Sequence, residues 1–164
     1  MTSRFALSLA SLTLAAAGAA AAPASLRLCE QPSVLNARQQ DWRLRLAALA
    51  RRELEDSGAA AAIVARAGLD LQRLGIRYSH AGVSLRASHH SAWAVRQLYY
   101  ACDEGRPRLF DQGLAGFVLG TEDPASGRLS IVVLPPAEAD ALERAALDDA
   151  RATRLLGATY SANA

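Results

Sequence analysis

Residues 76–102, IRYSHAGVSLRASHHSAWAVRQLYYAC, carry the pattern from which the rest of the architecture follows. The two outer parts, residues 76–86 and 92–102, alternate in polarity well enough to predict two β-strands. The four residues between them, Ser88 to Ser91, are polar and typical of a turn. We therefore predict an antiparallel hairpin at the centre of the domain.

A long helix is predicted before this hairpin. Residues 37–57 have helical periodicity, with Asn36 suited to cap the start and Gly58 to stop the end. Apolar residues at helical spacing form its predicted inner face: Trp42, Leu46, Leu49 and Leu54.

Two more strands and a second long helix complete the pattern. AAIVARA at residues 61–67 is short and apolar, and LSIVVL at residues 129–134 is the clearest buried strand. Pro135 and Pro136 end this strand and begin a helix over residues 137–156. The remaining segments are a short helix or turn at residues 112–119 and a loop at residues 103–108. Together they predict an α+β domain whose mainly antiparallel sheet is flanked by helices.

The first 24 residues have the three zones of a secretory signal peptide. Arg4 provides positive charge, an uncharged apolar stretch follows, and Ala22, Pro23 and Ala24 fit the cleavage pattern. The later part of the stretch is mostly Ala and Gly, which favours cleavage over retention as a membrane anchor. We expect a periplasmic or secreted protein in which residues 25–164 form a single domain without stable membrane insertion.

The charge balance argues against two classes of partner. The chain has 18 basic and 16 acidic residues, a formal net charge of +2. So weak a balance disfavours nucleic acid or an anionic membrane as the main partner. No glycine-rich phosphate loop is present, and His80, His89 and His90 have no further ligands at metal-site spacing. The sequence therefore predicts no cofactor, and its partner is expected to be a small molecule, a peptide or a cell-wall fragment.

Two cysteines, Cys29 and Cys102, follow the signal peptide. In an oxidising compartment a disulfide is the default for such a pair, and the closed loop would add about 4 to 5 kcal/mol. The alternative is two separate thiols, one of them reactive. Asp103 and Glu104 beside Cys102 disfavour a thiolate there, so the disulfide is the simpler expectation.

His80, in the segment YSHAG, is the strongest catalytic candidate. Small residues follow it and leave its ring room to take a proton from a thiol or a hydroxyl. If the hairpin turns near residues 88–91, the neighbouring strand brings Gln97 or Tyr99 close to His80, and Gln97 is the candidate for holding one imidazole tautomer. The alternative is structural, because a lone histidine in a strand is more often a hydrogen-bonding residue than a catalyst.

Several blocks of the sequence resemble a bacterial family catalogued as a domain of unknown function, family 2145. They are RYSHAG (77–82), VRQLYYACD (95–103), EGRP (104–107), DQGLAGFVLG (111–120) and ATYSANA (158–164). The resemblance extends over nearly all of the chain from Cys29 onward. A more distant likeness is to circularly permuted papain-like cysteine hydrolases of the NlpC type, which also place a histidine in a Ser-His-x-Gly strand. It implies a papain-like fold with His80 as the base and Gln97 as the orienting residue.

The resemblance also implies a nucleophile that this sequence does not contain. We expect an Asn-Cys pair soon after the Tyr-Ser-Ala-Asn segment, and the sequence ends at Ala164. One hypothesis is a domain lacking its C-terminal portion, part of a periplasmic cysteine hydrolase with its cysteine beyond residue 164. The other is a non-catalytic envelope module that binds a ligand or partner. The 164 residues favour the module, and the family resemblance favours the hydrolase.

Overall fold

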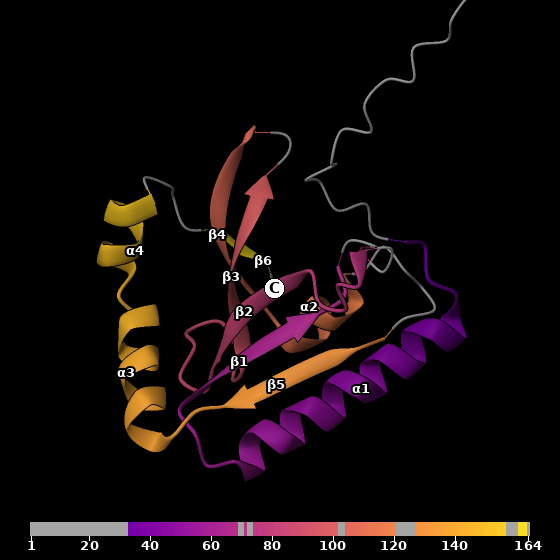
Figure 1. Cartoon of the computed structure of the whole chain (residues 1–164), viewed down its shortest axis with the longest axis horizontal. Coiled ribbons are helices and arrows are strands. Elements are labelled where there is room, and N and C mark those ends of the chain that lie inside the picture. Colours follow the sequence, from indigo (N-terminus) through magenta and orange to yellow (C-terminus); the bar gives the residue numbers. More distant parts are fainter. Residues whose placement is uncertain are drawn as a thin grey trace, which may run out of the picture.

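The structure is a computed structural model that describes residues 33–68, 71, 74–101, 104–120, 127–156 and 161–163. These residues form a mixed helix and strand domain, which confirms the predicted α+β class (Figure 1). In chain order the elements are α1 (Ala37–Asp56), β1 (Ala61–Arg66), β2 (His80–Leu85), β3 (Ala94–Ala101), β4 (Arg106–Gln112), α2 (Leu114–Leu119), β5 (Leu129–Val133), α3 (Pro136–Ala146), α4 (Asp149–Leu156) and β6 (Ser161–Asn163).

The strands make one sheet in the order β5-β1-β2-β3-β4-β6. The first five are antiparallel, and the short β6 joins β4 in parallel. The predicted central hairpin is confirmed as β2 and β3, which pair from Leu85 with Ala94 to Val83 with Arg96. The strand β2 begins at His80, four residues later than the pattern at residue 76 predicted.

Different helices pack against the two faces of the sheet. We call the side that packs against α1 and α2 the inner face, because its side chains form the core with both helices; Figure 1 shows α1 running beneath β5 and β1. The opposite side, the outer face, contacts α3 at β1 and α4 at β4. The core joins Leu54 of α1, Val64 of β1, Val95 of β3 and Phe117 of α2 with Trp93, all nearly or fully buried.

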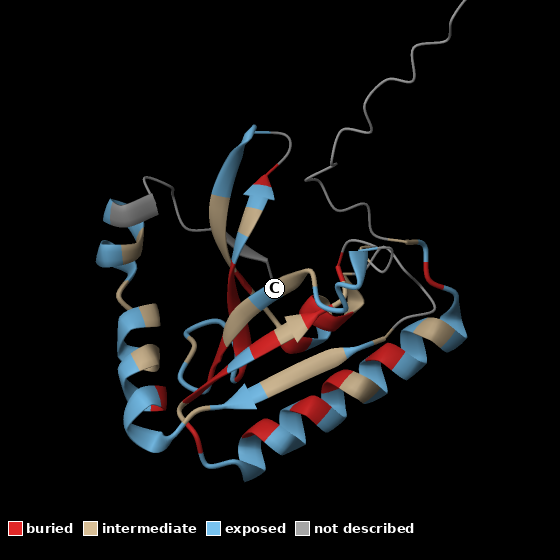
Figure 2. Cartoon of the chain, in the orientation of Figure 1, coloured by how far each residue is buried: buried red, intermediate tan, exposed pale blue. Residues whose placement is uncertain are grey.

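The helix α1 begins and ends where the sequence predicted. The Asn36 side chain accepts from the Gln39 backbone N–H, and the Gln39 side chain accepts from that of Asn36. Its inner face was predicted correctly at Leu54, which is fully buried, but wrongly at Trp42 and Leu49, which are nearly half exposed. The buried stripe has four members, of which the two alanines let the helix approach the sheet closely (Figure 2): Arg43, Ala47, Ala50 and Leu54.

The strand β4 begins at Arg106 and so replaces the second half of the loop predicted at residues 103–108. It pairs with β3 over seven residues, from Arg106 opposite Ala101 to Gln112 opposite Val95. Pro107 made a strand look improbable, because proline cannot donate a ladder hydrogen bond. It is tolerated because β6 pairs with β4 only at residues 110–112. Among the described strands, none pairs with the edge of β4 that faces away from β3 at Pro107.

Two predictions near the C-terminus are corrected. The predicted buried strand at residues 129–134 is β5, an edge strand whose Val132 and Val133 are 49% and 47% exposed. Its apolar character reflects packing of Leu129 and Ile131 on the core from the inner face. The single helix predicted over residues 137–156 is two helices, α3 and α4, separated at Leu147 and Asp148.

The signal peptide and both cysteines lie outside the described residues, so export and the disulfide stay predictions. In the part of the chain that the structure describes, no helix has the length and apolar character needed to cross a membrane.

Candidate functional site

His80 is the first residue of β2 and lies on the inner face of the sheet. It pairs with Arg66 across β1, in the same alternation that places Val64 and Gly82 side by side on that face. The His80 side chain is half-buried, whereas Arg66 is 4% exposed. The His80 imidazole therefore lies at the edge of the core, in contact with both the protein interior and solvent.

The predicted pair of His80 and Gln97 is brought together. Gln97 projects from β3 on the same face, and its Oε1 forms a short hydrogen bond with Nε2 of His80. The Gln97 Nε2 then donates to Oε1 of Gln112 on β4, at 2.8 Å. Three polar side chains on three neighbouring strands thus make a continuous row, which we call the His80 row: His80, Gln97 and Gln112.

The His80 row has a direction that fixes the imidazole tautomer. The Gln97 amide donates to Gln112 through nitrogen and therefore presents its oxygen, an acceptor without a proton, to His80. With this orientation of the Gln97 amide, Nε2 of His80 is the protonated nitrogen of the neutral ring. The lone pair of the neutral ring then lies on Nδ1, which is its basic nitrogen.

Aromatic side chains surround the imidazole. The ring of Phe117, in α2, lies 5.9 Å from that of His80 between centroids, and Tyr99 lies 6.4 Å away in an edge-on arrangement. The Arg66 guanidinium carbon lies 5.2 Å from the Phe117 centroid. His80 and Arg66 therefore share the Phe117 ring, which restricts the positions open to the imidazole.

Gly82 allows β2 and β3 to approach closely beside the His80 row. A Cβ at this position would lie 2.5 Å from Cγ1 of Val95, 2.9 Å from the Arg96 carbonyl oxygen and 3.2 Å from Cβ of Gln97. Any larger residue would therefore push β3 away, and Gln97 with it.

Gln112 is the member of the row that sequence reasoning missed. Residues 103–108 were predicted as a loop and Gln112 as the start of a short helix or turn, so the strand that carries Gln112 was not predicted. A partial signal was present in RPRLFDQ, where the polar residues Arg106, Arg108 and Gln112 fall on one face at a period of two, although Phe110 interrupts them. Tyr99, the other predicted neighbour, makes an edge-on contact with the His80 ring, whereas the hydrogen bond of Nε2 is with Gln97.

The other charged candidates that the structure describes pair with one another. Among the described residues no three His, Cys, Asp or Glu side chains are arranged to hold a metal ion. His90 lies in the β2–β3 loop, and its Nε2 is 3.6 Å from Oδ2 of Asp111. Glu104 forms ion pairs with Arg106 and Arg108, and the Arg108 hydrogen bond is the main reason that the pKa of Glu104 is lowered.

An apolar groove of about 360 Å³ lies where α1 passes the β2–β3 loop and the start of α2. Gly113, which follows Gln112 of the His80 row, is part of its wall. Its lining is mostly aliphatic, with Arg51 and Ser91 as the polar members: Leu44, Ala47, Ala48, Arg51, Ser91, Ala92, Gly113, Leu114 and Ala115.

Comparison with known proteins identifies the family. No curated protein and no solved structure matches the chain. The family described as "Uncharacterized protein conserved in bacteria (DUF2145)" matches residues 53–164, a range that begins later than the resemblance from Cys29 suggested. All three residues of the His80 row lie within it. The chain is therefore a member of the bacterial DUF2145 family.

Proposed function

We propose that this protein is exported to the periplasm or beyond, and that His80 is the acid–base group of a papain-like hydrolytic site. The observation that carries this proposal is the direction of the His80 row. Gln97 accepts from Nε2 of His80 and donates to Gln112, which places the basic lone pair on Nδ1 and fixes the orientation of the ring.

The chemistry best suited to this arrangement is thiol catalysis on an amide or ester. Nδ1 of His80 takes the proton of a thiol, and the resulting thiolate attacks the carbonyl carbon. The imidazolium then returns the proton to the leaving amine or alcohol, and water hydrolyses the thioester. Gln97 is a neutral partner and supports an imidazolium less strongly than a carboxylate would, which suits a thiol better than a less acidic hydroxyl.

The thiol in this proposal comes from chain that follows Ala164 in a longer gene product. Support for this comes from β6, whose Asn163 pairs through its backbone with Gln112, the last residue of the His80 row. After Gln112 the chain leaves β4 and continues into α2, which packs on the inner face and places Phe117 beside His80. A segment after β6 that turned back in the same way would approach the His80 ring.

Alkylation of the native product with iodoacetamide tests this function without a known substrate. We expect an intact mass that lacks residues 1–24 and one thiol that reacts before reduction. The His80→Gln variant should react about tenfold more slowly at neutral pH, because the thiolate loses its base. His89→Gln is the matched control, since His89 lies in the exposed β2–β3 loop. An equal alkylation rate in the His80→Gln variant would refute the proposal.

The apolar groove beside α1 supports a second candidate function, non-catalytic binding of a small molecule or peptide. Its volume of about 360 Å³ is within the range of roughly 300 to 1,000 Å³ found for ligand pockets. This function predicts a native product without a free thiol that carries an apolar ligand in native mass spectrometry. Ala47→Trp should then release that ligand by filling the groove, whereas Arg52→Trp on the exposed side of α1 should not.

A further inference from the structure

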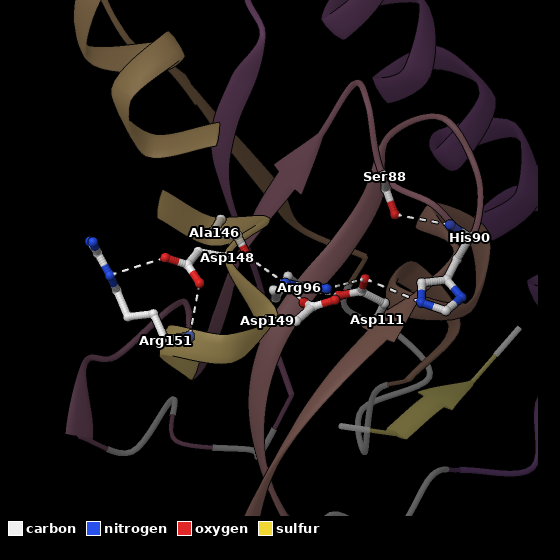
Figure 3. Close-up of polar contacts among 8 residues, drawn as sticks. All are labelled: Ser88, His90, Arg96, Asp111, Ala146, Asp148, Asp149 and Arg151. Atoms are coloured by element: carbon white, nitrogen blue, oxygen red, sulfur yellow. Dashed lines mark hydrogen bonds and ion pairs between the residues drawn. The ribbon is translucent and has the colours of Figure 1, made fainter. Parts of the chain in front are cut away.

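Directly behind the His80 row, on the outer face, Arg96 and Asp111 form a buried ion pair. Arg96 precedes Gln97 in β3 and Asp111 precedes Gln112 in β4, so each charged residue shares a strand with the amide that points the other way. The two side chains are 5% and 1% exposed. The fork is bidentate, with Nε to Oδ1 at 2.8 Å and Nη2 to Oδ2 at 2.9 Å (Figure 3).

The third nitrogen of Arg96 ties this pair to the helices of the outer face. Nη1 donates to Oδ1 of Asp149 at 2.7 Å and also to the carbonyl oxygen of Ala146. Ala146 is the last residue of α3 and Asp149 the first of α4, so a single guanidinium joins two strands and the junction of two helices (Figure 3).

This arrangement favours one register of β3 against β4. Arg96 and Asp111 are directly opposite each other in the ladder, and a planar guanidinium meets both oxygens of a carboxylate in one alignment. A slip of one residue would turn Gln97 to the outer face, and a slip of two would separate it from Gln112. A slip would also leave a buried charge without its partner, which is strongly unfavourable.

We propose that Arg96 and Asp111 are positioning residues for the His80 site, and that their bidentate pair holds the Gln97 amide between His80 and Gln112. This inference rests on the proposed role of His80. Neither residue touches the imidazole; they act through the backbone that they share with the two glutamines.

The double variant Arg96→Met with Asp111→Leu separates positioning from folding. Two apolar residues of similar volume often replace a buried ion pair without loss of stability, and the half-exposed Asp149 remains solvated. We expect the Nε2 proton of His80, followed by NMR, to exchange with water about fivefold faster, which corresponds to the loss of one net hydrogen bond. The matched control is Arg151→Met in α4, which removes the exposed ion pair with Asp148 at the α3–α4 junction and should leave the exchange unchanged (Figure 3).

The Arg96→Lys variant keeps the test decisive if the double variant fails to fold. A lysine retains the charge beside Asp111 but not the fork, so the Nε2 exchange of His80 should again be faster than in the wild type. Wild-type exchange in either folded variant would overturn the positioning role. A wild-type protein with no protected Nε2 proton would instead overturn the proposed function of His80, so the two failures are distinguishable.

Discussion

Gly82→Ala is the smallest change expected to disturb the His80 row. The added methyl group would lie 2.5 Å from Cγ1 of Val95 and 2.9 Å from the carbonyl oxygen of Arg96. Val95 is fully buried and β-branched, so it has little freedom to rotate away. The strands must therefore separate, and overpacking of this kind costs about 1 to 3 kcal/mol.

Thermal unfolding and NMR of the His80 ring together measure the effect. The melting temperature of Gly82→Ala should fall by about 3 to 10 °C, given roughly 3 °C for each kcal/mol in a domain of this size. The Nε2 proton of His80 should also lose protection, because Cβ of Gln97 lies 3.2 Å from the new methyl group. Gly113→Ala is the control, since its nearest atom would be the Ser91 Oγ at 4.0 Å. A Gly82→Ala protein with wild-type stability and wild-type protection would refute the close-approach argument.

Three further changes test the core, the first helix and the β3–β4 turn. Phe117→Ala empties a fully buried site in the core and should lower the free energy of unfolding by about 3 to 5 kcal/mol in urea denaturation; a loss below 1 kcal/mol would mean that Phe117 is not packed as described. Asn36→Ala removes the capping box of α1 and should cost about 1 kcal/mol in the same assay, with an unchanged midpoint as the contrary result. The Arg108 hydrogen bond lowers the pKa of Glu104 below the usual value of 4.5. The ionised Glu104 carboxylate therefore stabilises the fold above pH 4.5, and this stabilisation is lost as the pH falls through the lowered pKa. A carboxyl NMR titration of Glu104 should therefore have its midpoint below 4.5, and a midpoint at or above 4.5 would contradict the ion pairs.

Local signals in the sequence predicted most of the elements correctly. Asn36 and Gly58 bounded the first helix because capping and left-handed backbone are short-range effects. Alternation in residues 76–102 predicted the central hairpin for the same reason. The meeting of His80 with Gln97 followed from that hairpin, because diagonal neighbours on one face of paired strands lie within reach of long side chains.

The remaining features depend on contacts that are distant in the sequence. Pro107 lies in a strand because of where the distant β6 pairs, and no local pattern contains that information. Trp93 has a φ of +64°, a conformation unusual for a large residue, and its complete burial in the core holds it there. Gln112 joins the His80 row for a similar reason, since the register of β4 is set partly by the buried pair of Arg96 and Asp111.

The most direct measurement is the tautomer of His80, by ¹⁵N NMR of the imidazole nitrogens at a pH where the ring is neutral. The directed row predicts a proton on Nε2 and a lone pair on Nδ1 in the wild type. In Gln97→Leu, which removes the acceptor, the two tautomers should mix. A wild-type ring protonated on Nδ1, or an Nε2 proton equally populated in Gln97→Leu, would contradict the assignment of His80 as an oriented base.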